Sequence, residues 1–170
     1  LSDEPAQTND VALRSLAERR ALASREALLA LVSSKDSAVA SEAVKSLRVL
    51  AQEDNIPALI DLLNAAEDSA QKDNLSRTIV AVCERNPDVE KRADQVLAAF
   101  DKAAKPEQKA ALAGVLGGVG NKAALDALRA HLEKAGPEVR DAIIDAYAGW
   151  PTAATADDLL AMLKNPRDDK

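Results

Sequence analysis

The sequence predicts an all-α protein that is built from short antiparallel helix pairs stacked along the chain. Of its 170 residues 47% are apolar, yet Ala, Leu and Val dominate that set, and Phe, Trp, Tyr, Met and Cys occur once each. Ala and Leu are the apolar residues that favour helices most, whereas β-sheets favour aromatic and β-branched residues. Capping residues and prolines recur along the chain, and the apolar residues between them repeat at three-and-four spacing, which is typical of amphipathic helices.

Capping residues, prolines and glycines mark where helices begin and end, and they predict ten helices. The predicted helices form a single repeat domain over residues 9–164, between a polar lead over residues 1–8 and a charged tail over residues 165–170. Pro106 and Pro137 stand in first turns, where a missing N–H costs nothing, and Glu107 and Glu138 suit the positive end of the helix dipole. Thr155 with Asp158 resembles a capping box. The predicted helices cover residues 9–22, 24–33, 37–52, 55–66, 69–85, 88–104, 106–118, 121–134, 137–149 and 155–164.

Alternate predicted helices resemble one another. Four segments share one pattern, in which a capping residue is followed by apolar residues at matching offsets: Ser24–Leu31, Asn55–Leu62, Asn121–Leu128 and Thr155–Met162. Residues 89–97 form a looser copy of this pattern between the second and third segments. Successive copies are about 31 to 34 residues apart, a period typical of helical repeats. Each helix carries an apolar stripe too wide for an isolated pair to bury, so we expect the pairs to stack.

The segments Ser37–Leu47 and Gly136–Ala146 resemble the second helix of a HEAT repeat, with a capped turn, a Val, a charged residue and then Ala with Leu or Ile. The resemblance implies a right-handed, armadillo-type α-solenoid of about four pairs plus flanking helices. It also implies a scaffold or adaptor that binds another protein on its concave face. Residues 148–151 followed by 157–160 are similar to bacterial HEAT domains within larger multidomain proteins, and since the chain begins at Leu1 rather than Met, we expect a longer parent protein.

The net charge of −6 and the pI near 4.9 indicate a protein partner rather than a nucleic acid, because the overall field repels polyanions. No apolar run approaches the roughly 18 residues of a membrane span, so we expect no membrane insertion. The lone Cys83 cannot form an internal disulfide, which leaves the compartment open. We expect the isolated domain to be a monomer that binds a protein or peptide.

No catalytic, cofactor or metal site is predicted, and the chain is not expected to be an enzyme. A Gly-x-Gly-x-x-Ala match begins at Gly118, but a dinucleotide fingerprint follows a strand, and the residues upstream favour a helix. We interpret these glycines as a tightly packed helix end that stops at Gly120, before the cap of Asn121, and leaves a smooth dent on one face. His131 has no His or Cys at ligand spacing and is expected at the surface, and Cys83 is expected as a buried thiol.

A partner-binding row is predicted opposite the apolar stripe of the second helices. Its residues carry more basic groups than the chain average, so it could hold an acidic peptide or protein face, although a plain solvated face is the alternative. Tyr147 joins this set because Tyr and Trp are enriched in binding hot spots, whereas packing is favoured for the nearby Trp150. The predicted partner-binding residues are Lys45, Arg48, Arg77, Lys109, Arg140, Asp145 and Tyr147, accompanied in the row by Lys72 and Asp141.

Two other functions remain open at this point. The first is a structural spacer within a larger protein. The second is an enzyme-associated helical-repeat protein, similar to the phycobilin lyases or the alkylpurine DNA glycosylases. These would need a chromophore pocket or a basic, aromatic-lined groove, and the acidic balance with few aromatic residues counts against both.

Overall fold

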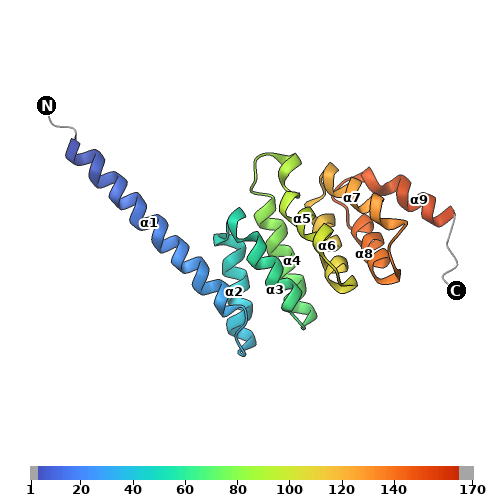
Figure 1. Cartoon of the computed structure of the whole chain (residues 1–170), viewed down its shortest axis with the longest axis horizontal. Coiled ribbons are helices and arrows are strands. Elements are labelled where there is room, and N and C mark those ends of the chain that lie inside the picture. The colour runs from blue at the N-terminus through green and yellow to red at the C-terminus, as the bar shows by residue number, and fades with distance from the viewer. Residues whose placement is uncertain (1–3, 165–170) are drawn as a thin grey trace. The chain divides into compact units, whose positions relative to one another are not determined.

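The computed structural model describes the backbone of residues 4–164 and the side chains of Leu16 and of residues 18–164. Residues 4–164 form nine α-helices and three short 3-10 turns, with no strand (Figure 1). The chain divides into two compact units, Leu1–Leu50 and Ala51–Lys170. The all-α repeat architecture is confirmed. A single repeat domain over 9–164 stays a prediction, and the predicted tail over 165–170 lies outside the described residues.

The first unit consists of α1 (Glu4–Leu31) and α2 (Ser37–Leu50), which pack together as a pair. The predicted break between residues 22 and 24 is wrong, since α1 is continuous from Glu4, and this helix begins earlier than the predicted residue 9. The polar lead over residues 1–8 stays a prediction. Ser24 was expected to cap a new helix, but its hydroxyl donates to the Arg20 carbonyl at 2.9 Å. That bond joins residues one turn apart and is compatible with a helix interior. The predicted stripe of α2 is buried at Ala43, Val44 and Leu47.

The second unit contains three helix pairs followed by α9. A short 3-10 turn precedes the first helix of two of these pairs and also precedes α9. The pairs are α3 (Ile56–Ala65) with α4 (Ser69–Cys83), α5 (Asp94–Lys102) with α6 (Pro106–Val119), and α7 (Lys122–Leu132) with α8 (Pro137–Ala148); α9 covers Ala156–Lys164, and the turns are η1 (Glu53–Asn55), η2 (Val89–Lys91) and η3 (Ala153–Thr155).

The helix predicted over 88–104 is shorter than expected. The Asp88 carboxylate accepts from the Glu90 N–H at 3.2 Å and so caps the single turn η2, and the Arg92 Nε donates to the Asn86 carbonyl at 2.9 Å. These local bonds favour a turn over a continuous helix, and α5 begins only at Asp94.

The second helices form a continuous layer, because α6 contacts both α4 and α8. The predicted apolar stripes face the interior, where Leu75, Ile79, Leu112, Val115 and Ile143 are almost completely buried. Stacking of successive pairs therefore buries apolar surface that an isolated helix pair would leave exposed to water, as in other solenoid proteins.

Asn121 joins successive repeats. Its side-chain oxygen accepts from the Ala124 N–H at 3.0 Å and caps α7, while its Nδ2 donates to the carbonyls of Val89 at 2.9 Å and Glu90 at 3.1 Å. The side chain is buried, so these bonds replace water that the polar groups cannot reach. One residue thus starts a helix and satisfies the turn of the preceding repeat.

Glycines on α6 allow its close contact with both neighbouring helices. A Cβ at Gly117 would lie 2.6 Å from the Cβ of Ala146 on α8, and one at Gly118 would lie 2.7 Å from a Val80 methyl on α4. Gly120 then ends α6 with φ 64°, a left-handed conformation that glycine adopts without strain. The predicted tightly packed helix end at Gly120 is confirmed.

We expect two Gly→Ala substitutions on this helix to change stability in opposite directions. Gly117→Ala should lower the free energy of unfolding by about 1–3 kcal/mol, because the new methyl meets the backbone of Ala146. Gly114→Ala should raise it by about 0.5–1 kcal/mol, because no atom lies within 4 Å of the new Cβ and Ala favours helix. Urea denaturation followed by circular dichroism measures both values. Equal changes for the two variants would contradict the close-packing account.

Candidate functional site

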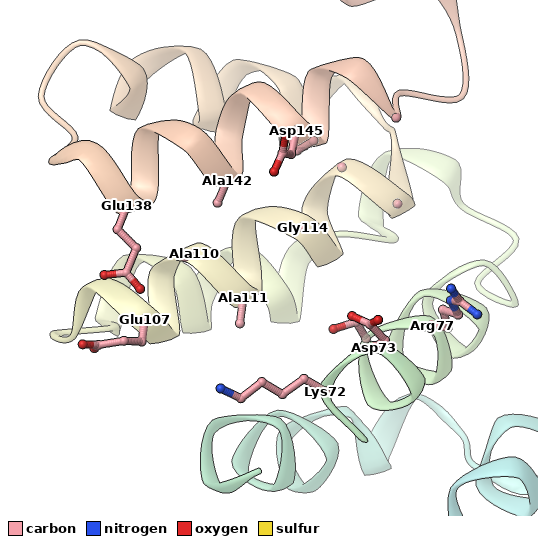
Figure 2. A pocket seen from close by; sticks show the side chains of 15 residues that line it. Lys72, Asp73, Arg77, Glu107, Ala110, Ala111, Gly114, Glu138, Ala142 and Asp145 are labelled. Atoms are coloured by element: carbon pink, nitrogen blue, oxygen red, sulfur yellow. The ribbon is translucent and has the colours of Figure 1, made fainter. Parts of the chain in front are cut away.

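A groove of about 670 Å³ runs across the layer of second helices in the second unit (Figure 2). All of its lining residues belong to α4, α6 and α8, except Gly149, which follows α8. They are Lys72, Asp73, Ser76, Arg77, Glu107, Ala110, Ala111, Gly114, Gly117, Gly118, Glu138, Ala142, Asp145, Ala146 and Gly149.

The floor of the groove is made of glycine and alanine. On α6 the lining residues recur at three-and-four spacing, as expected for one face of a helix. The predicted smooth dent is therefore confirmed, because Gly114, Gly117 and Gly118 all line the groove. Since no large side chain stands on this floor, a bound segment can approach the helix backbones closely.

Charged side chains surround this floor. Glu107 and Glu138 lie on the first turns of α6 and α8 at one end of the groove, and Asp145 lies toward the other end (Figure 2). Lys72, Asp73 and Arg77 come from α4. Within the part of the chain that the structure describes, no ion pair joins any of these six side chains to another residue. Their charges are therefore available to a ligand.

Only part of the predicted row lines the groove. Arg77 and Asp145 do, together with Lys72, whereas Lys109 and Arg140 do not. The reason is helical phase: Glu107 and Lys109 are two residues apart and point to different sides of α6, as do Glu138 and Arg140 on α8. Four carboxylates and two cations line the groove, so this surface is more acidic than the predicted row, whose role in binding stays a prediction.

Lys45 and Arg48 belong to the first unit. Lys45 forms an exposed pair with Glu42 at 3.3 Å, and Arg48 is half-buried. Neither residue is part of the groove described here.

Tyr147 was predicted to contact a partner, and this assignment is wrong because its side chain is only 1% exposed. The ring meets Trp150 edge-on, with centroids 6.4 Å apart, and Trp150 is also buried, which confirms packing for Trp150. Thr155 does not form the predicted capping box. Its hydroxyl donates to the Tyr147 carbonyl at 2.8 Å, and Asp158 instead pairs with Arg129 at 2.6 Å.

The sequence reasoning missed the two glutamates of the groove. Glu107 and Glu138 were interpreted only through the helix dipole, yet each follows the proline that starts a second helix. Because equivalent positions in stacked repeats lie side by side, this shared Pro-Glu register could have indicated a common acidic surface.

Catalytic groups are sparse around this groove. Its lining contains one hydroxyl, from Ser76, and no His or Cys. Among the described residues no group of three or more His, Cys, Asp and Glu side chains could hold a metal ion. No helix in the same residues is long and apolar enough to cross a membrane. The arrangement therefore offers shape and charge for binding.

Stacked helix pairs with a groove across their second helices define an α-solenoid of the repeat-protein class. A family model described as HEAT repeats matches residues 84–170, just over half of the chain. The chain belongs to the HEAT-repeat family, whose repeats generally mediate protein interactions. Searches of curated proteins and of solved structures found no match.

Cys83 is predicted to be unreactive in the folded protein. The side chain is buried, and this burial, with a smaller contribution from the Glu53 carboxylate, raises the pKa of the thiol from 9.0 to about 12. At pH 8 the thiolate fraction is then about one in 10⁴, against about one in ten in the unfolded chain. Thiol labelling with and without denaturant measures the difference. Rapid labelling of the native protein would contradict the buried assignment.

Tyr147 is the only tyrosine, so absorbance of its phenolate reports its ionisation directly. Burial, reinforced by Asp158 and opposed by Arg129, raises its pKa from 10.0 to about 12. Because the folded pKa is raised, this phenol stabilises the fold below pH 10, and that contribution is lost as pH rises from 10 to 12. We expect phenolate absorbance to appear near pH 12 or together with unfolding. A midpoint near 10 in a chain that is still helical would contradict the burial.

Proposed function

We propose that this chain is a non-catalytic scaffold or adaptor module that binds a segment of a partner protein in the groove of α4, α6 and α8. The observation that carries the proposal is a floor of glycine and alanine beside charged side chains that form no intramolecular ion pairs. We call these charged residues the rim of the groove: Lys72, Asp73, Arg77, Glu107, Glu138 and Asp145. The partner is a separate protein or another domain of a longer parent chain. Membership of the HEAT-repeat family supports a protein as the ligand.

The floor favours a rigid binding surface. The close contact between Gly117 and Ala146 fixes α6 against α8, and the glycines and alanines of the floor have no side-chain rotamer freedom to lose. A surface that is already ordered saves the free energy of ordering on binding. The groove is open along three helices, which suits an elongated protein segment rather than an enclosed small molecule.

The rim favours a partner with basic residues. Glu107, Glu138 and Asp145 are all exposed and lie on α6 and α8, so basic residues of the bound segment would face this side. Lys72 and Arg77 lie on α4 and would face an acidic or polar residue. Such charges mainly steer the encounter and set the orientation of the bound segment. This proposal replaces the acidic partner that the sequence predicted.

Filling the groove should abolish partner binding while the fold is kept. Gly114→Leu adds a side chain where no atom lies within 4 Å of the new Cβ, and Leu favours helix more than Gly. Ala130→Leu is the matched control, because Ala130 is exposed on α7 and does not line the groove. We expect a protein captured from lysate of the source cells by the wild type to be captured equally by the control, and at least tenfold less by Gly114→Leu. Quantitative mass spectrometry measures the capture.

A second comparison tests the charge of the rim. Glu107→Gln with Glu138→Gln should weaken binding of the same purified partner and reduce its salt dependence, since two rim charges are removed. Equal capture by Gly114→Leu and the control would place binding elsewhere. Capture of no specific protein by the wild type would favour the structural spacer.

A further inference from the structure

A second, smaller pocket of about 240 Å³ lies at the edge of the solenoid, apart from the groove. It is formed where the connection between α5 and α6 meets the connection between α7 and α8, so two successive repeats contribute to it. The lining residues are Ala103, Ala104, Pro106, Lys109, His131, Lys134, Ala135, Gly136 and Val139.

All titratable side chains that line this pocket are basic: Lys109, His131 and Lys134. The carboxylates of Glu107 and Glu138 line the groove instead, and Glu133, which precedes Lys134, is not part of the lining. A purely basic pocket is unusual in a chain with a net charge of −6. Glu107, Glu133 and Glu138 are sequence neighbours of lining residues, but none of their side chains lines the pocket, so the charged groups on its surface are basic.

One aromatic ring positions two of these basic groups. Phe100 is fully buried, the His131 ring meets it edge-on at 4.8 Å between centroids and 72° between planes, and the Lys109 Nζ lies 5.5 Å from its centroid. The His131 Nδ1 lies 2.9 Å from the Ala127 carbonyl and donates to it, which assigns the hydrogen to Nδ1 and leaves Nε2 for another partner. His131 and Lys109 are thus held in place before any ligand binds.

Two helix starts border the pocket. Pro106, the first residue of α6, and Gly136, the N-cap of α8, both line it. Neither helix has a side-chain cap on its first N–H groups. Glu107 and Glu138 in the first turns offset part of the positive charge at these two helix ends, so the lysines supply most of the positive charge of the pocket.

We propose that this pocket binds a phosphate group. The two lysines supply two positive charges, which match a phosphate dianion better than a singly charged carboxylate. His131 Nε2 carries no hydrogen in this tautomer and can accept from the O–H group of a hydrogen phosphate dianion. The volume suits one such group with a few water molecules, since a water molecule in the liquid occupies about 30 Å³. The site goes beyond the proposed protein-binding groove and does not depend on it. Its phosphate comes from the free ion or from a phosphorylated side chain.

The test is a titration of the whole chain with inorganic phosphate, followed by NMR of the ring signals of His131 and Phe100. Both residue types occur once in the sequence, so the signals need no assignment experiments. At fixed pH and ionic strength, with chloride as the balancing ion, we expect saturable shifts of both rings. Shifts that rise linearly without saturation would overturn the proposal.

Matched variants then separate binding from overall charge. Lys109→Gln with Lys134→Gln should weaken phosphate binding at least tenfold, because two charge-assisted contacts are lost. Lys35→Gln with Lys164→Gln changes the net charge equally at exposed positions outside the pocket and should leave binding within twofold of the wild type. Unchanged binding in the first pair, even with a lowered melting temperature, would show that these lysines are merely structural and overturn the proposal.

A last comparison identifies the source of the phosphate. O-phosphoserine that binds at least as tightly as inorganic phosphate would support the pocket as a site for phosphorylated side chains, and weaker binding would support the free ion. Acetate that binds as tightly as either would overturn the assignment to phosphate.

Discussion

The contact between Gly117 and Ala146 is the constraint on which the rest of the second unit depends. It lets the backbones of α6 and α8 approach more closely than larger side chains would permit. On one side, this approach leaves a groove whose floor is defined by short side chains. The groove therefore follows from one choice of residue size in the helix interface, whereas the smaller pocket lies at the starts of the same two helices.

The same two helices separate charges of opposite sign. Residues advance by about 100° per position around an α-helix, so Glu107 and Lys109 are placed on different sides of α6 although they are neighbours in sequence. Carboxylates consequently face the groove while lysines surround the smaller pocket. A net charge summed over the whole chain hides this separation, and the two surfaces are suited to ligands of opposite charge.

Most of the fold could be predicted because short-range signals agree with it. Pro106, Pro137 and Gly120 mark real helix ends, and the apolar spacing identifies the buried stripes. The break predicted before Ser24 is absent from α1, because a serine fits either a helix cap or a helix interior. The sequence alone does not show which hydrogen bond its hydroxyl forms. The site was less predictable. Charge counting along a helix ignored its phase, so Lys109 and Arg140 were grouped with Asp145, and burial of Tyr147 depends on contacts with residues distant from it in sequence.

The buried amide of Asn121 has a consequence for how the solenoid comes apart. Its three hydrogen bonds connect the start of one repeat with two carbonyls of the repeat before it, and a loss of either repeat would leave polar groups without partners. Repeat proteins gain cooperativity from such nearest-neighbour terms. Unfolding at this joint is therefore expected to spread to the adjacent repeat, so that the two repeats melt as one unit.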